Sequence, residues 1–142
     1  MGSMNDEYYE KLAASERRYP GPNVFFVSGY TQAEADTLQE FLHLLGYENV
    51  PVKACTLDQL DTRLNTVLTE ETETAPVGEG KLPHAMIFSG MTANDVQLVM
   101  RRFSECSLPR PIFATTTPTN LDFTVKELLK HLLAEARAAG NR

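Results

Sequence analysis

Short apolar runs alternate along the chain with longer stretches in which apolar residues recur every three or four positions. Short runs bounded by turn residues are typical of strands buried in a parallel sheet, and the longer periodic stretches predict helices with one apolar face. The predicted strands are residues 24–27, 50–55, 84–89 and 111–115. The predicted helices are residues 31–45, 57–68, 92–106 and 124–139. The pattern therefore predicts an α/β fold built from two βαβα units.

The same pattern divides the chain into parts. It predicts one α/β domain over residues 23–139, with half-repeats 23–68 and 84–139. The acidic linker 69–81 joins the two halves and has no apolar periodicity. Residues 1–22 form a polar N-terminal segment that could carry a short helix from Asp6 to Arg17 before Pro20-Gly21-Pro22. At 142 residues the chain has the usual size of a single domain.

Two short motifs suggest that the halves are related. Ser28-Gly29-Tyr30-Thr31 follows the first predicted strand, and Ser89-Gly90-Met91-Thr92 follows the third, 61 positions later (89 minus 28). The apolar faces of the following helices match at this spacing. After a one-residue slip, residues 51–54 match 111–114. Shared periodicity makes chance agreement less plausible, so we predict an internal repeat.

Crossover connections limit the topology of four strands joined through helices. Such connections are right-handed, which leaves few arrangements. We favour a mostly parallel sheet in the order 2-1-3-4, because it puts the two most apolar strands side by side in the middle. Helices then cover both faces. An order that follows the sequence is the alternative.

Each predicted helix begins with a threonine followed three positions later by an acid or an amide. This spacing predicts a capping box, in which the two side chains satisfy backbone N–H groups of the first turn. The pairs are Thr31/Glu34, Thr56/Gln59, Thr92/Asp95 and Thr124/Glu127.

The Ser-Gly-x-Thr turns are the first candidate binding site. In the order 2-1-3-4 we expect a crevice at the carboxyl ends of strands one and three, lined by both turns, where helix N-termini could hold an anion. The candidate binding residues there are Ser28, Gly29, Thr31, Ser89, Gly90 and Thr92. The simpler interpretation is that serine ends a strand, glycine turns and threonine caps a helix. Neither a Gly-x-Gly-x-x-Gly fingerprint nor a P-loop is present.

The second candidate is the polar stretch 115–123, which follows the fourth strand and has no evident counterpart after the second. Thr117, Thr119 and Asn120 could hydrogen-bond a ligand or partner, although the same residues are ordinary turn formers.

A family resemblance covers residues 84–133. Strand, Ser-Gly-x-Thr, helix, strand and a leucine-rich last helix resemble the small bacterial domain-of-unknown-function family DUF3783. The matching positions are Thr117, Thr119, Asn120, Phe123, Leu128 and Leu129. Phe123 stands where the family commonly has tryptophan. The resemblance implies no activity, because none is established for the family.

Catalytic and metal-binding patterns are weak. His43, His84 and His131 are scattered with no nucleophile beside them, and Cys55 and Cys106 lack metal-ligand spacing. We therefore expect no cofactor, no metal and no catalytic residue, and favour a non-enzymatic protein.

Charge and hydropathy restrict the classes of partner that we expect. The net charge of −6 comes without a basic stripe, which argues against nucleic acid as a partner. No apolar run is long enough to span a bilayer and no signal peptide is evident, so we expect a cytoplasmic protein and no membrane partner.

Two functional hypotheses follow. The first is an interaction or regulatory domain that binds another protein or a second copy of itself, through residues 115–122 or the N-terminal Tyr8 and Tyr9. The second is a small-ligand or anion-binding protein, conceivably an enzyme, that uses the crevice between the two turns.

Overall fold

A computed structural model describes residues 17–70 and 82–140 of the chain. The expected N-terminal helix and most of the acidic linker lie outside these residues. The strands are β1 (Val24–Ser28), β2 (Val52–Ala54), β3 (Ala85–Ser89) and β4 (Ile112–Thr115). The α-helices are α2 (Gln32–Leu44), α3 (Leu64–Thr69), α4 (Ala93–Arg102) and α5 (Val125–Gly140). Short 3-10 turns are η1 (Leu57–Gln59), η2 (Phe103–Cys106) and η3 (Asn120–Asp122).

The four strands form one sheet in the predicted order, β2-β1-β3-β4. Both outer pairs, β1 with β2 and β3 with β4, are parallel. The central pair is antiparallel, with Val24 opposite Ser89 and Ser28 opposite Ala85. The sheet is thus mostly parallel and mixed, and its two halves run in opposite directions.

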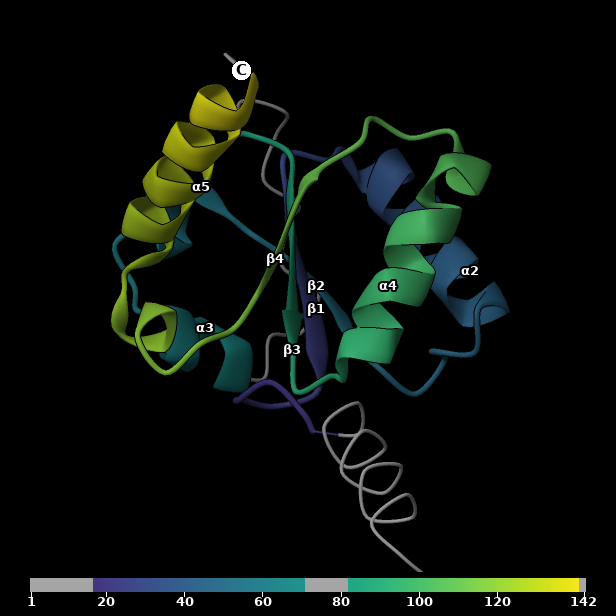
Figure 1. Cartoon of the computed structure of the whole chain (residues 1–142), viewed down its shortest axis with the longest axis horizontal. Coiled ribbons are helices and arrows are strands. Elements are labelled where there is room, and N and C mark those ends of the chain that lie inside the picture. The colour runs from purple at the N-terminus through teal and green to yellow at the C-terminus, as the bar shows by residue number, and fades with distance from the viewer. Residues whose placement is uncertain (1–16, 71–81, 141–142) are drawn as a thin grey trace, which may run out of the picture.

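Helices cover both faces of the sheet, as predicted from the buried apolar strands (Figure 1). Alternate residues of a strand point to opposite faces. Phe25 and Val27 therefore pack with Leu38 and Phe103 under α2 and α4. Val24 and Phe26 belong to the other cluster, which α3 and α5 cover; its fully or nearly buried helix members are Leu64, Val67, Leu68, Val125, Leu128, Leu129 and Leu132.

The central strands and the α-helices of the two halves begin 61 residues apart. β1 and β3 begin at 24 and 85, α2 and α4 at 32 and 93, and α3 and α5 at 64 and 125. The ladders agree as well, because Val27 pairs with Ala54 and Phe88 pairs with Thr115. The expected one-residue slip in the second strand pair is therefore wrong. It matched two prolines, whereas the backbone register aligns Pro51 with Ile112.

The helix expected at 57–68 is interrupted. Only η1 and α3 form, and Leu57 is 51% exposed instead of facing the core. The backbone between them pairs with the segment before α5: Leu64 N–H donates to Phe123 C=O at 2.8 Å, and Val125 N–H donates to Thr62 C=O at 3.0 Å. These long-range bonds replace helical ones, which a pattern along the sequence does not reveal.

Three of the four expected threonine caps precede α-helices and form boxes with hydrogen bonds in both directions. They are Thr31 with Glu34, Thr92 with Asp95 and Thr124 with Glu127. At Thr56 the backbone N–H donates to Gln59 Oε1 at 3.0 Å, but the element that follows is η1. The helix starts at Thr31, Thr92 and Thr124 were therefore located correctly from sequence.

Candidate functional site

The residues that precede β3 pack against the first Ser-Gly-x-Thr turn. Ser28 Oγ donates to Pro83 C=O at 2.6 Å, and a side chain at Gly29 would collide with Leu82 C=O at 2.7 Å. Gly29 has φ +86°, a conformation that glycine adopts without strain. The residues just before β3 therefore occupy the space in which a ligand was expected.

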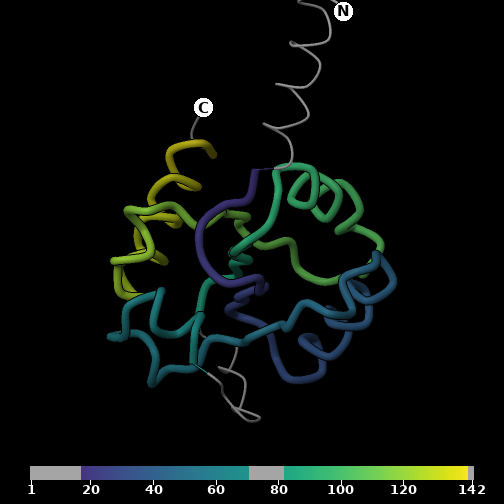
Figure 2. The backbone as a smooth tube through the Cα atoms, turned by 90° about the horizontal axis from the view of Figure 1, so that it is seen from below, coloured from purple at the N-terminus to yellow at the C-terminus, as the bar shows by residue number. Residues whose placement is uncertain are grey.

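The second turn is filled in the equivalent way by the residues before β1. A side chain at Gly90 would lie 2.8 Å from Gly21 C=O, and Ser89 Oγ donates to Pro20 C=O at 3.4 Å. Arg18 forms an isolated antiparallel β-bridge with Thr92. Figure 2 shows the first described residues running beside the segment that leads into α4. Every buried side-chain N or O atom in the described residues has a hydrogen-bond partner, so neither turn presents an unsatisfied polar group.

The two turns do not share a crevice. Because β1 and β3 are antiparallel, Ser28 and Ser89 lie at opposite ends of the central strand pair. Each turn follows the carboxyl end of its own strand, so Thr31 and Thr92 are also far apart along the strand direction. The expected common anion site between the turns is therefore incorrect. Its physical cause is the reversal of strand direction at the centre of the sheet.

The Thr115–Phe123 segment is held in a compact turn. Asn120 Oδ1 accepts from Thr117 N–H at 2.7 Å, Thr117 Oγ1 accepts from Asn120 N–H at 3.0 Å, and Asn120 Nδ2 donates to Thr115 C=O at 3.0 Å. Thr119 is exposed at the start of η3.

This segment does have a counterpart after β2, contrary to the sequence-based expectation. Thr116 N–H donates to Phe88 C=O, as Cys55 N–H does to Val27 C=O at positions 61 residues earlier. Thr117 and Asn120 stand where Thr56 and Gln59 stand in the first half. The segment is therefore not an insertion, and what distinguishes it is the space beside it.

That space is a groove of about 470 Å³ between β4, the Thr117 turn and α5. Thr117, Thr119 and Asn120 line one end of it, so three predicted binding residues come together there. The other lining residues are Ile112, Phe113, Ala114, Thr115, Phe123, Leu128, His131, Leu132 and Glu135. Ser28, Gly29, Thr31, Ser89, Gly90 and Thr92 are not among them.

The groove runs along a free edge of the sheet. β4 is an outermost strand, and it bonds β3 through alternate residues: Ile112 N–H donates to His84 C=O and Thr116 N–H to Phe88 C=O. In a parallel ladder the intervening residues turn their N–H and C=O groups outward. Phe113 and Thr115 are these residues, and among the described residues only Asn120 reaches them, at Thr115 C=O.

The outer wall of the groove is the face of α5 that carries His131 and Glu135. The His131 ring stacks on Phe123, with ring centroids 5.0 Å apart and an interplanar angle of 16°. Glu135 makes no ion pair with any residue in the described ranges. Sequence reasoning missed Ala114, His131 and Glu135, because the strand edge and the helix face meet only after folding.

The equivalent position in the first half is occupied by a lysine. Lys53 corresponds to Ala114, and its Nζ donates to Leu68 C=O at 2.7 Å and to Glu70 C=O at the end of α3. An ammonium group at a helix C-terminus satisfies unpaired carbonyls and complements the helix dipole. Half one therefore has a lysine bound to the end of α3 at the position where half two has Ala114 beside the groove.

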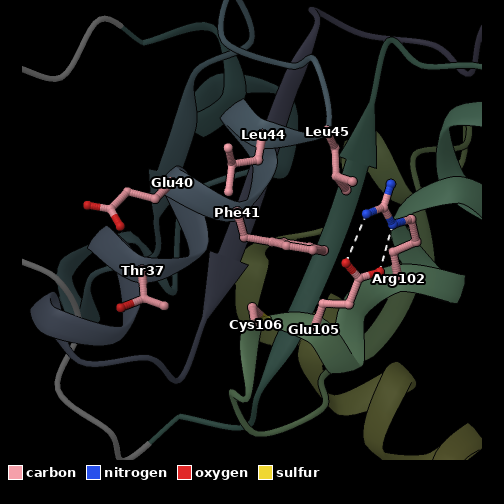
Figure 3. A pocket seen from close by; sticks show the side chains of 8 residues that line it. All are labelled: Thr37, Glu40, Phe41, Leu44, Leu45, Arg102, Glu105 and Cys106. Carbon is pink, nitrogen blue, oxygen red and sulfur yellow. Dashed lines mark hydrogen bonds and ion pairs between the residues drawn. The ribbon is translucent and has the colours of Figure 1, made fainter.

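A second, smaller pocket of about 290 Å³ lies between α2 and the α4–η2 segment. It is lined by Thr37, Glu40, Phe41, Leu44, Leu45, Arg102, Glu105 and Cys106 (Figure 3). Arg102 and Glu105 point toward each other and form an ion pair at 2.6 Å, which leaves them less available to a ligand. None of the predicted binding residues lines this pocket.

One polar cluster stabilises the second turn. Asp95 accepts from the Thr92 backbone N–H at 3.0 Å and from the Tyr47 hydroxyl at 2.8 Å. Burial alone would raise the pKa of Asp95, but these hydrogen bonds outweigh it and lower that pKa below its usual value. Burial and the bond to Asp95 raise the pKa of Tyr47. The cluster is a structural cap, and none of its residues lines the groove.

The remaining reactive and metal-ligating side chains of the described residues are few. Burial raises the pKa of the Cys55 thiol to about 12, so this cysteine is a poor nucleophile. No metal-binding group of three or more His, Cys, Asp or Glu residues occurs in residues 17–70 and 82–140. In the same residues, no helix has the length and apolar character needed to cross a bilayer.

The fold and groove define a four-stranded α/β sandwich with a groove along the β4 edge of its sheet. Residues 84–138 match the family model described as Domain of unknown function (DUF3783). The match supports the family resemblance seen in the sequence, and it includes every residue that lines the groove. No curated protein and no solved structure matches the chain.

Proposed function

We propose that this protein is a non-enzymatic interaction domain that binds an extended segment of a partner protein along the free edge of β4. The observation that carries the proposal is the coincidence of an unpaired strand edge with a groove of about 470 Å³. Strand addition uses main-chain hydrogen bonds for affinity and pockets for alternate side chains for specificity.

The backbone of β4 supplies the main-chain part of this recognition. Phe113 offers an outward N–H and C=O, and Thr115 offers an outward N–H. Exposed edges of this kind promote pairing with another chain unless they are blocked. β4 carries neither a lysine nor a proline within Ile112–Thr115, although Pro111 precedes it. The edge is therefore available to a partner.

The groove supplies the side-chain part. A strand added beside β4 lies about 4.8 Å from it and points alternate side chains toward α5. Those side chains would meet Phe123, Leu128 and Leu132, which line the groove. The other side chains would point to the α4 side of the sheet, where Arg110 lies 5.0 Å from the centre of the Phe113 ring.

The constant spacing of 61 residues supports an internal repeat in which one copy became specialised for binding. In half one, Lys53 bonds to the end of α3, and in half two the smaller Ala114 lines the groove. Two free cysteines, one of them buried, suit a reducing compartment. Together with the resemblance to a bacterial family, they support a cytoplasmic bacterial setting.

Proline substitution at matched edge positions tests the proposal. Thr115→Pro removes an outward N–H from β4, and Ala54→Pro removes the equivalent N–H from β2; both should fold, because neither N–H bonds the sheet. The probe is a short peptide of alternating valine and threonine, titrated by isothermal calorimetry. We expect Thr115→Pro to weaken binding at least about tenfold and Ala54→Pro to leave it unchanged.

Equal binding by all three proteins, or no binding by any, would overturn the proposal. Sedimentation analysis of the unliganded proteins tests whether a second copy of the chain pairs with β4. A wild-type dimer that Thr115→Pro dissociates would show that a second copy of the chain, instead of a partner segment, pairs with β4.

A small ligand is the second candidate, favoured by the volume of the same groove, which falls in the range of ligand pockets. Hydroxyl and amide groups of Thr117, Thr119 and Asn120 at one end would orient it. A thermal-shift screen over nucleotides, sugar phosphates and carboxylates tests this candidate. Ligand at a hundred times its dissociation constant stabilises by about 2.7 kcal/mol, which such a screen detects.

A further inference from the structure

The charge distribution of the groove indicates the chemistry of the partner. Glu135 is the only carboxylate among the lining residues, and no lysine or arginine lines the groove. Glu135 is ion-paired with none of the residues in the described ranges. A cationic side chain brought into the groove would therefore meet an acceptor that has no competing partner.

The first half of the chain shows how a cationic side chain fits this region of the fold. Lys53 lies at the position of Ala114 and directs its ammonium group to the carbonyls of Leu68 and Glu70. These residues correspond to Leu129 and His131 of α5, which continues as helix to Gly140. In half two the equivalent carbonyls are thus inside a helix, and the lysine stem and charge are both missing.

We infer that the partner segment carries a lysine or arginine whose stem lies over Ala114 and whose charge pairs with Glu135. This inference rests on the proposed strand addition and specifies its partner. A residue of the added strand that lies beside Ala114 would point its side chain toward α5. A lysine or arginine there would be within reach of the helix face that carries His131 and Glu135. Apolar side chains two positions away on that strand would fill the space beside Phe123 and Leu132.

Peptides that differ only in the place and sign of one charge test the inference on the intact chain. The parent alternates valine and threonine. One variant carries lysine in place of the central valine, a second carries lysine in place of the neighbouring threonine, and a third carries glutamate in place of the central valine. Because side chains alternate between faces, the two lysine variants put equal charge on opposite faces of the added strand.

We expect the valine-to-lysine peptide to bind about fivefold more tightly than the threonine-to-lysine peptide, as a partly exposed ion pair permits. This preference should shrink at high salt. In Glu135→Lys, the glutamate peptide should bind more tightly than the valine-to-lysine peptide. Glu105→Lys is the matched control, because Glu105 is a helical carboxylate that lies outside the groove, and it should retain the wild-type order.

The outcomes separate this inference from the function on which it rests. If the parent peptide binds and both lysine peptides bind equally, strand addition stands and the cationic partner is wrong. The cationic partner is equally wrong if Glu105→Lys inverts the order as well, because general electrostatics would then explain it. If no peptide binds, the proposed function itself is overturned.

Discussion

The two halves of this protein share a backbone frame and differ in what lies beside their outer strands. The central strands, the α-helix starts and the ladder pairs recur 61 residues apart. In half one, Lys53 reaches the end of the six-residue helix α3. In half two, Ala114 and the 16-residue α5 leave a groove of about 470 Å³ beside β4. The shared spacing describes the scaffold, and the candidate site lies where the two halves differ.

The largest loss of stability should come from substitutions in the hydrophobic core that both halves share. Leu68 and Leu129 occupy equivalent positions and are 2% and 5% exposed in one core cluster. Replacing either with alanine leaves a cavity and should lower the free energy of unfolding by about 2–5 kcal/mol. Urea unfolding measures both variants. A large loss in one variant and none in the other would contradict a single shared core.

Transferring the closing lysine should abolish the difference between the halves. In Ala114→Lys the new stem would occupy the groove and its ammonium would pair with Glu135. We expect binding of the alternating valine–threonine peptide to weaken at least about tenfold, with little change in urea stability. Calorimetric titration measures the affinity, and Ala114→Ser is the control of similar size to alanine. Undiminished binding by Ala114→Lys would place the peptide elsewhere.

Removing the native lysine tests the other side of the comparison. Lys53→Met keeps the apolar stem but loses the hydrogen bonds to the last carbonyls of α3. The free energy of unfolding should fall by about 1 kcal/mol, since a partly exposed charged hydrogen bond is lost at a helix end. Urea unfolding reports the loss. A protein as stable as wild type would mean that Lys53 does not cap α3.

The threonine caps should be nearly equivalent in the two halves. Thr31→Ala and Thr92→Ala should each lower the free energy of unfolding by about 1 kcal/mol, while serine at either position should be close to neutral. We expect the Thr92 loss to be the larger, because Asp95 also holds Tyr47. Thermal unfolding of the four variants gives the comparison. Serine variants as weak as the alanine ones would show that the hydroxyl is not the stabilising group.

The smallest effect should be a pH dependence specific to half two. The folded-state pKa of Asp95 is lowered by its hydrogen bonds, so its stabilisation is present above the pKa of the unfolded chain and is lost as the pH falls through the folded value. Asp95→Asn should therefore flatten the acid limb of stability, measured by urea unfolding between neutral and acidic pH. An unchanged acid limb would contradict the proposed role of Asp95.

Sequence patterns predicted most of the scaffold because local rules determine it. Apolar runs marked the four strands, threonines at 31, 92 and 124 marked helix starts, and the order 2-1-3-4 followed from the two most apolar strands. The interruption of the second helix was missed, because the bonds of Leu64 and Val125 join residues about 60 positions apart in the chain.

The candidate site was predicted only in part. Thr117, Thr119 and Asn120 do line the groove, but the two Ser-Gly-x-Thr turns were wrongly expected to face each other. Strand direction at the centre of the sheet decides that question, and no single turn encodes it. Glu135 gave no sequence signal, because one acid on an exposed helix face is ordinary until a strand edge is placed beside it.

Amide hydrogen exchange at the two sheet edges tests the central claim most directly. The outward amides of Phe113 and Thr115 on β4 have their counterparts in Val52 and Ala54 on β2. Exchange is followed by nuclear magnetic resonance with and without saturating alternating valine–threonine peptide. We predict that the peptide slows exchange at Phe113 and Thr115 and leaves Val52 and Ala54 unchanged. Unaltered exchange at Phe113 and Thr115, or equal slowing at both edges, would contradict strand addition at β4.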